Sequence, residues 1–274
     1  KYFDLNIAQS EINSRVELGN ISSMCKDIIK VSKMYEYKGN DITLESVWLY
    51  LVSVFSDLSG LKIVIYGAGN IGSKLALKLA ESGANIYIIT RDQAKSSLIA
   101  SALNSIKHKY VLSNISISTN DIYSSIGANA IIGCTNSGAV ISSDMVAVMD
   151  NNGAVVDVGK GTISTDAIQT CVERNIKIWR ADITPMIGPL VLSAIEMNDL
   201  LSNKYGRKIL ECGVCVVSGG YIGNKYDVIV DSYINPKKIF GVCSDAGKAF
   251  VECDEVAKNN LEKVEKIISL AKVS

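Results

Sequence analysis

A glycine-rich turn that joins an apolar run to a helical pattern constrains the fold of this chain more than any other feature. Residues 61–66 read LKIVIY and residues 67–72 read GAGNIG, which has the form G-x-G-x-x-G. After a strand and at the start of a helix, this pattern is typical of dinucleotide-binding folds. Gly67 permits the tight turn, Gly69 lets a pyrophosphate approach the backbone, and Gly72 lets the helix pack closely. The free N–H groups at the start of the helix would then hold the phosphates.

The chain after this turn alternates between β-rich runs and helical patterns. Unbroken Val/Ile runs separated by helices indicate a parallel sheet that is covered on both faces. We therefore expect an α/β fold, a doubly wound parallel sheet of the Rossmann type, at residues 61–183. Its strands are predicted at 61–66, 85–90, 110–117, 128–133, 154–158 and 176–180, and its helices at 71–81, 94–106, 145–149 and 165–174.

The segments that flank this domain follow different patterns. Residues 1–60 form a helical N-terminal segment, in which Thr43 offers a cap for the second helix. Its helices are predicted at 12–31 and 46–58, with a break at 37–41 between them. Residues 184–274 form a smaller mixed segment that we expect to complete a substrate cleft. Its predicted elements are a helix at 189–203, strands at 213–218, 227–231 and 239–244, and a helix at 256–270.

The charge balance and the apolar runs exclude several classes of partner. Lys and Arg number 28, and Asp and Glu also number 28, so the formal net charge is zero. Neither a nucleic acid nor an acidic membrane is therefore expected as the partner. No apolar run approaches the ~18–20 residues that span a bilayer. Seven Cys without regular spacing indicate reduced thiols in a cytoplasmic protein. The first residue is Lys1, which fits both a processed chain and a fragment of a longer one.

The end of the second predicted strand indicates which dinucleotide binds. An Asp or Glu there would accept hydrogen bonds from the ribose 2′-hydroxyl of NAD. In this chain the residues are Thr90, Arg91 and Asp92. Arg91 can pair with a 2′-phosphate and Thr90 can hydrogen-bond to it, which favours NADP. Asp92 lies one or two positions after the place where an acidic residue would bind the ribose of NAD, so NAD stays open as an alternative. An ordinary solvated charge at Arg91 stays open as well.

The loops after the fourth and fifth strands supply the remaining candidates for cofactor binding. In open α/β sheets a ligand lies outside the carboxyl ends of the strands, so both loops should line the nicotinamide side. Cys134 is interpreted as a small buried residue rather than a nucleophile, because no nearby His could activate it. The candidate cofactor-binding residues are Gly67, Ala68, Gly69, Asn70, Ile71, Gly72, Thr90, Arg91, Asp92, Cys134, Thr135, Asn136, Val158 and Gly159.

Three charged residues are candidates for proton transfer beside a hydride. Lys160 stands between glycines after the fifth strand, Asp182 follows the sixth, and Asp41 lies in the break before the domain. A Lys–Asp pair across a cleft is a workable acid/base couple for carbonyl–alcohol interconversion. Each of the three is also compatible with a solvated charge or a turn residue. The single His, His108, is interpreted as a surface residue. No metal site is expected, because the C-x-x-C pair at 212–215 falls within a predicted strand.

The central domain resembles the NADP-binding domain of shikimate/quinate dehydrogenases and their relatives, including glutamyl-tRNA reductases. The likeness rests on residues 62–92, with the GAGNIG loop and the Thr-Arg pair after the second strand. Residues 153–159 are similar to the corresponding strand of methylenetetrahydrofolate dehydrogenases. The resemblance implies NADP binding and names no substrate. In shikimate dehydrogenases an Asn-Thr-Asp segment carries the catalytic Asp, and residues 39–41, Gly-Asn-Asp, are a loose counterpart without the Thr. The family's catalytic Lys has no matching motif in residues 1–38.

Together these features predict an NAD(P)-dependent oxidoreductase. A hydride would pass between the nicotinamide and a small polar metabolite, at a C–OH/C=O or C–N centre, while Lys160 and an Asp handle the proton. Two other functions stay open. One is a non-catalytic dinucleotide-binding sensor or scaffold domain of a longer protein, whose bound cofactor would never turn over. The other is a lyase or cyclodeaminase with tightly bound NAD, which would show no net oxidation. The apolar sides of the terminal helices are compatible with a homodimer, although burial in a core explains them equally well.

Overall fold

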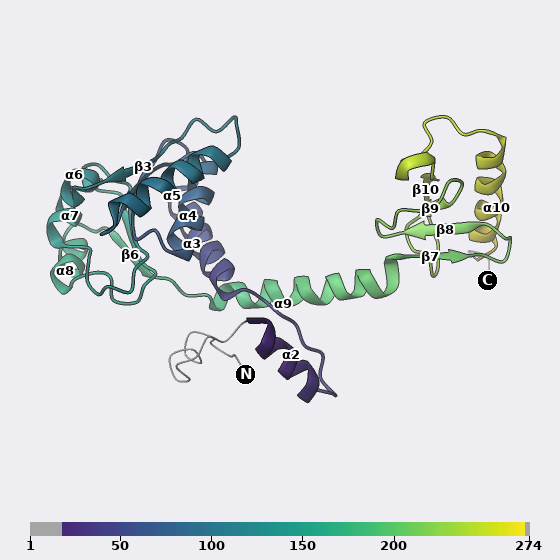
Figure 1. The fold of residues 1–274 in the computed structure, drawn as a ribbon, viewed down its shortest axis with the longest axis horizontal. Coiled ribbons are helices and arrows are strands. Elements are labelled where there is room, and N and C mark those ends of the chain that lie inside the picture. Colours follow the sequence, from purple (N-terminus) through teal and green to yellow (C-terminus); the bar gives the residue numbers. More distant parts are fainter. Residues whose placement is uncertain (1–17, 272–274) are drawn as a thin grey trace. The chain divides into compact units, whose positions relative to one another are not determined.

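The computed structural model describes residues 18–271 and divides into two compact units, Lys1–Gly188 and Pro189–Ser274 (Figure 1). The strands of the first unit are β1 (Lys62–Tyr66), β2 (Asn85–Ile89), β3 (Ile115–Ser118), β4 (Ala130–Gly133), β5 (Ala154–Asp157) and β6 (Lys177–Arg180). They form one parallel sheet of six strands in the order β3-β2-β1-β4-β5-β6. The order reverses between β1 and β4, which is the switch point of a Rossmann sheet. The predicted α/β fold class is therefore confirmed.

Helices cover both faces of this sheet, and Figure 1 shows one group on either side of it. One group comprises α3 (Gly39–Phe55), α4 (Asn70–Glu81) and α5 (Gln93–Ile106). The other comprises α6 (Asp121–Ser125), α7 (Ser143–Ala147) and α8 (Thr165–Glu173). Ile63 and Ile65 of β1 belong to the core under the first group, and Val64 belongs to the core under the second. All three are fully buried, which explains why the β1 run carries no polar alternation.

The N-terminal segment differs from its prediction in where the second helix begins. Helix α3 starts at Gly39, so the expected break at 37–41 is wrong from that residue onward. Thr43 does not cap the helix, because it lies inside the first turns and its Oγ1 donates to the carbonyl of Gly39 at 3.1 Å. Helix α2 (Leu18–Ile28) covers part of the first predicted helix, and the earlier part of that prediction lies outside the described residues.

Strand β3 is shorter than the predicted strand at 110–117 and begins at Ile115. The side chain of Asn104 marks this start, because it donates to the carbonyl of Ile115 at 2.7 Å and accepts from its N–H at 3.1 Å. Residues 110–114 form a loop before the strand. Ser113 in this loop is buried and donates to the carbonyl of Ala80 on α4.

The second unit is built on a mixed sheet, as predicted for the C-terminal segment. Its strands are β7 (Gly206–Ile209), β8 (Cys215–Ser218), β9 (Val228–Val230) and β10 (Ile239–Val242), in the order β10-β9-β8-β7. The β8–β9 pair is parallel and the other two pairs are antiparallel. Helix α10 (Glu255–Ala271) packs on the sheet through Val264 and Ile268. Strand β7 was not predicted. It is polar and largely exposed, and Arg207 ties it to the buried Asp227 through two hydrogen bonds of 2.7 and 3.0 Å.

Helix α9 (Thr184–Asp199) begins five residues before the predicted start at 189. Its first turn is prepared by Asp182, whose Oδ1 accepts from the N–H of Thr184 at 2.9 Å and from its Oγ1 at 2.7 Å. Pro185 follows in the first turn, where a residue without an N–H leaves no helical hydrogen bond unmade. A π-helical turn at Leu200–Lys204 follows α9. Among the described helices, none is both long and apolar enough to cross a membrane.

Candidate functional site

A cavity of about 560 Å³ lies at the carboxyl ends of β1, β2 and β4. This is the crevice at which open α/β sheets bind their ligands, because the strand order reverses there. The lining residues are Asn40, Tyr66, Gly67, Ala68, Gly69, Asn70, Ile71, Ile89, Thr90, Arg91, Asp92, Lys95, Ser96, Ile99, Cys134, Thr135, Asn136, Ser137 and Val140. Every predicted cofactor-binding residue therefore lines the cavity, except Gly72, Val158 and Gly159.

The three glycines of the turn differ in why a side chain would or would not fit at each position. Gly67 has φ +106°, and a Cβ there would lie 2.5 Å from the carbonyl oxygen of Cys134. At Gly72 a Cβ would lie 2.1 Å from the carbonyl oxygen of Gly67, so α4 could not pack as closely against the glycine turn that precedes it. A Cβ at Gly69 would meet no protein atom within 4 Å. Gly69 is therefore not required by packing, and its open side faces the cavity that it lines.

The first turn of α4 presents free backbone donors to the cavity. The helix begins after Gly69, which makes no side-chain cap, and Asn70 and Ile71 line the cavity. The first N–H groups of a helix have no intrahelical acceptor and carry the positive end of its dipole. An anionic group such as a pyrophosphate is stabilised at this position.

The end of β2 presents two cations, of which the sequence analysis identified one. Arg91 is exposed and lines the cavity, and Lys95 on the first turn of α5 lines it as well. Asp92 is the N-cap of α5, where its Oδ1 accepts from the N–H of Lys95 at 3.0 Å. Thr90 donates from its Oγ1 to the carbonyl of Asp92 at 2.9 Å. The missed Lys95 had a sequence signal, since it lies at the start of the predicted helix at 94–106, four residues after Arg91.

Tyr66 is a second residue that the sequence analysis missed at this cavity. It is the last residue of β1, and its hydroxyl donates to Oδ2 of Asp121 at 2.7 Å. Burial, followed by the contact with Asp121, raises the pKa of Tyr66 to about 12. Tyr66 therefore stays protonated at neutral pH and forms a fixed part of the cavity wall.

The loop after β4 closes another side of the cavity. Burial raises the pKa of the Cys134 thiol to about 12, so this group is a thiol and not a reactive thiolate at neutral pH. Thr135 donates from its Oγ1 to the hydroxyl of Ser137 at 2.9 Å. A Cβ at Gly159 would lie 1.9 Å from the carbonyl oxygen of Thr135, so Gly159 lets the loop after β5 pack on this one. Val158 packs against the core instead of lining the cavity.

None of the three candidates for proton transfer lines the cavity. Asp41 lies in the first turn of α3 and pairs with Lys74 at 2.7 Å, which lowers its pKa. The hydrogen bonds from Thr184 lower the pKa of Asp182. Both carboxylates thus have a structural partner. Lys160 is exposed and has φ +61°, a left-handed conformation that is uncommon outside glycine.

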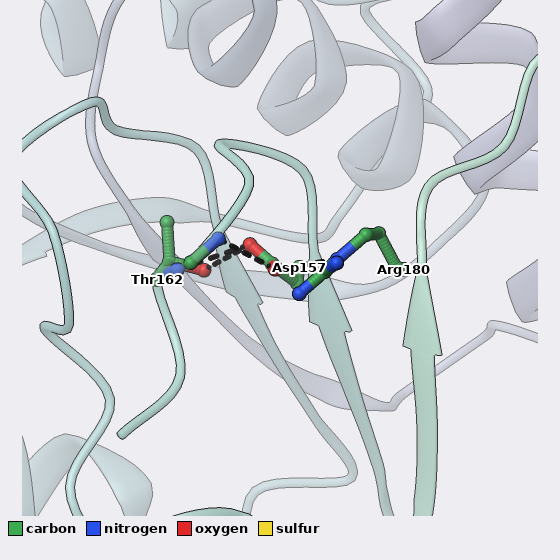
Figure 2. Close-up of polar contacts among 4 residues, drawn as sticks. Asp157, Thr162 and Arg180 are labelled. Carbon is green, nitrogen blue, oxygen red and sulfur yellow. Dashed lines mark hydrogen bonds and ion pairs between the residues drawn. The ribbon is translucent and has the colours of Figure 1, made fainter. Parts of the chain in front are cut away.

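A buried carboxylate at the end of β5 organises the loop that contains Lys160. Asp157 is 3% exposed and accepts from the N–H of Gly161 at 2.7 Å and from the N–H and Oγ1 of Thr162 at 3.1 and 2.7 Å. Arg180 at the end of β6 donates from Nε to its Oδ2 at 3.2 Å, and Figure 2 shows these contacts. Burial opposes ionisation, but the bonds from Gly161, Thr162 and Arg180 outweigh it and lower the pKa of Asp157.

Comparison with known proteins relates the region around the cavity to a dehydrogenase family. Residues 51–160 match the family described as shikimate / quinate 5-dehydrogenase. The matched segment contains β1 to β5 of the parallel sheet. The resemblance expected from the sequence is confirmed for this family, whereas the likeness to glutamyl-tRNA reductases and methylenetetrahydrofolate dehydrogenases stays a prediction. A search of curated proteins gives no match to the chain.

Solved structures that match this chain do so over part of its length. A shikimate dehydrogenase in complex with NADP⁺ is 20% identical with a TM-score of 0.41, over 51% of this chain and 50% of that chain. The shikimate dehydrogenase from Aquifex aeolicus is 18% identical with a TM-score of 0.41, over 59% and 55%. A dipicolinate synthase from Bacillus halodurans is 16% identical with a TM-score of 0.45, over 69% and 64%. The chain therefore spans about half to two thirds of the length of these proteins.

Proposed function

We propose that the cavity binds an NAD(P) dinucleotide, with NADP preferred, and that the protein transfers a hydride between this cofactor and a small polar metabolite. The observation that carries the proposal is the charge arrangement at the end of β2. Arg91 and Lys95 both line the cavity, whereas the carboxylate of Asp92 is engaged as the N-cap of α5. A 2′-phosphate would meet two cations there, and a 2′-hydroxyl would find no free carboxylate among the lining residues.

Arg91→Gln and Lys95→Gln are each expected to weaken NADP⁺ binding about tenfold and to leave NAD⁺ binding unchanged. Each substitution removes one charge-assisted hydrogen bond to the 2′-phosphate, which NAD⁺ lacks. Calorimetric titration of the purified chain with the two dinucleotides measures both affinities.

Lys109→Gln is the matched control for this pair of variants. Lys109 is exposed and does not line the cavity, so its loss should change neither affinity. Tighter binding of NAD⁺ than of NADP⁺ by the wild type would contradict the preference and assign the ribose to Asp92. A wild-type chain that binds neither dinucleotide would overturn the proposal as a whole.

Lys160 is the residue we propose for proton transfer to or from the substrate oxygen. When bound, the dinucleotide supplies the hydride donor or acceptor, and this chain has to supply the proton. Lys160 stands on the loop after β5, and Asp157 fixes that loop by accepting the N–H of Gly161. Asp41 and Asp182 stay proposals for the carboxylate partner, although both are engaged by other groups.

Lys160→Gly is expected to keep the free energy of unfolding within about 1 kcal/mol of the wild type, whereas Lys160→Val is expected to lower it by about 1–2 kcal/mol. The reason is the φ of +61°, which glycine adopts freely and a β-branched residue does not. Urea unfolding of the three proteins gives the comparison. Equal stability of the two variants would show that this backbone conformation is not imposed at Lys160.

A non-catalytic dinucleotide sensor is the second candidate function. It is favoured by the contacts of the two candidate carboxylates, since Asp41 pairs with Lys74 and Asp182 bonds to Thr184. This function predicts tight NADP⁺ binding without formation of NADPH on any of a set of small hydroxy acids. Absorbance at the reduced nicotinamide band distinguishes it from a dehydrogenase.

A further inference from the structure

Asn40 lines the dinucleotide cavity but lies outside the segment that matches the dehydrogenase family. It stands in the first turn of α3, whereas the matched segment begins at residue 51. The other lining residues belong to β1, β2 or the stretches of chain that follow β1, β2 and β4. Asn40 is partly buried, and its side-chain amide has no hydrogen-bond partner among the described residues. This amide is therefore available to a ligand in the cavity.

Two ion pairs hold α3 parallel to α4. Asp41 pairs with Lys74 at 2.7 Å. One turn further along both helices, Glu45 pairs with Lys78 at 2.6 Å. The partners are 33 residues apart in both pairs, so the two helices run in the same direction. Helix α4 begins at the carboxyl end of β1, where the cavity lies, and α3 therefore begins at the same edge of the sheet. The two pairs thus fix the first turn of α3, with Asn40, beside the glycine turn.

Contacts with the end of β6 show which side of the cavity α3 occupies. Tyr50 of α3 stacks on Trp179 of β6, with ring centroids 4.3 Å apart. Ser46 of α3 donates from its Oγ to the carbonyl of Asp182, which follows β6, at 2.5 Å. The 2′-phosphate site proposed at the end of β2 lies on the other side of β1 in the strand order. Because the glycine turn follows β1, Asn40 approaches that turn from the side opposite to the adenosine.

We infer that Asn40 binds the nicotinamide half of the dinucleotide, by a hydrogen bond from its side-chain amide to an oxygen of the nicotinamide mononucleotide group. The inference rests on the proposed function, because it concerns the same cavity and the same ligand. An Asn side chain offers two donors and an acceptor, which suit both phosphate oxygens and ribose hydroxyls. The ion pairs between α3 and α4 hold Asn40 in place before the ligand arrives, which lowers the entropic cost of binding. This half is common to NAD and NADP, so Asn40 adds affinity for both without discriminating between them.

The test compares whole dinucleotides with a ligand that has only the adenosine half. NADP⁺, NAD⁺ and adenosine 2′,5′-bisphosphate are each titrated calorimetrically into the full chain. Asn40→Ala should weaken the binding of NADP⁺ and NAD⁺ by the same factor, about five- to tenfold, and leave the binding of the bisphosphate unchanged. Arg91→Gln should give a different pattern, because its loss weakens NADP⁺ and the bisphosphate and leaves NAD⁺ unchanged.

Asn40→Asp separates a role in binding from a role in folding. A carboxylate in the first turn of a helix is favourable, so this variant should unfold at the same urea concentration as the wild type or a higher one. Next to the phosphates of a dinucleotide the same charge is repulsive. Asn40→Asp should therefore weaken NADP⁺ and NAD⁺ binding more than Asn40→Ala does, and added salt should reduce the difference between the two variants.

Asn152→Ala is the matched control, since Asn152 is exposed, precedes the amino end of β5 and does not line the cavity. It should change none of the three affinities. A wild type that binds none of the three ligands would overturn the proposed function. Wild-type binding of NADP⁺ that both Asn40 variants leave unchanged would overturn this inference alone. An equal loss of affinity for the dinucleotides and the bisphosphate would do the same, because it would place Asn40 at the adenosine half or in the fold.

Discussion

Gly69→Ala is expected to weaken dinucleotide binding at least tenfold while it leaves the chain folded, with a free energy of unfolding within about 1 kcal/mol of the wild type. The backbone at Gly69, with φ −78° and ψ −170°, is accessible to any residue, and a Cβ there meets no protein atom within 4 Å. The space it would fill belongs to the cavity, at the start of α4 where the pyrophosphate has to approach the backbone. Binding therefore falls although packing is unaffected.

Gly72→Ala is the matched variant, because it adds the same methyl group to the same turn but directs it at the protein. That Cβ would lie 2.1 Å from the carbonyl oxygen of Gly67, so the loop and the helix would have to move apart. We expect a loss of about 2–3 kcal/mol in stability together with the loss of binding. Urea unfolding and NADP⁺ titration of both variants separate the two effects. Unweakened NADP⁺ binding by Gly69→Ala would show that the ligand does not approach this turn.

The Rossmann sheet was predictable because its signals are local. A buried parallel strand has to be apolar on both faces, and β1 keeps this pattern without a break from Ile63 to Ile65. The glycine turn was predictable for the same reason, since its three glycines act within six residues. The start of α3 was not predictable in this way. Gly39-Asn40-Asp41 has the composition of a turn, and the ion pair of Asp41 with Lys74 of α4 is a tertiary contact that supports the helical form.

Two contacts that the sequence analysis missed depend on the packing of distant segments. Asp157 and Arg180 are 23 residues apart, and only the register of β5 with β6 brings them together. Asp157 could be recognised as a charge at the end of a buried strand, but its partners could not be named. Strand β7 was missed because its pattern is polar and exposed, and its ion pair joins Arg207 to Asp227, 20 residues further along the chain. In both cases a buried carboxylate binds an arginine from a distant segment, and the spacing of hydrophobic residues gives no sign of such a contact.

Asp157→Asn is expected to lower the free energy of unfolding of the first unit by about 2–4 kcal/mol at pH 7. Both oxygens of Asp157 accept hydrogen bonds, so either orientation of an Asn amide turns its NH₂ group toward donors. The buried side chain has no access to water that could replace the lost bonds. Trp48 and Trp179 are the two tryptophans of the chain, and both pack against the core of this unit. Their fluorescence during urea unfolding therefore reports this unit.

The difference in the free energy of unfolding between the wild type and Asp157→Asn should also depend on pH, and the direction of that dependence can be predicted. The pKa of Asp157 is lowered in the folded state, so the ionised group stabilises the fold above its unfolded pKa of about 3.9. This contribution is lost as the pH falls through the folded pKa, where a protonated Asp157 resembles Asn. The stability gap between wild type and Asp157→Asn should thus be full at pH 7 and shrink below about pH 4. Asp166→Asn, at an exposed position in the first turn of α8, should cost less than about 1 kcal/mol. A gap that persists undiminished to pH 3 would mean that the packing of residue 157, and not its charge, holds the loop after β5 in place.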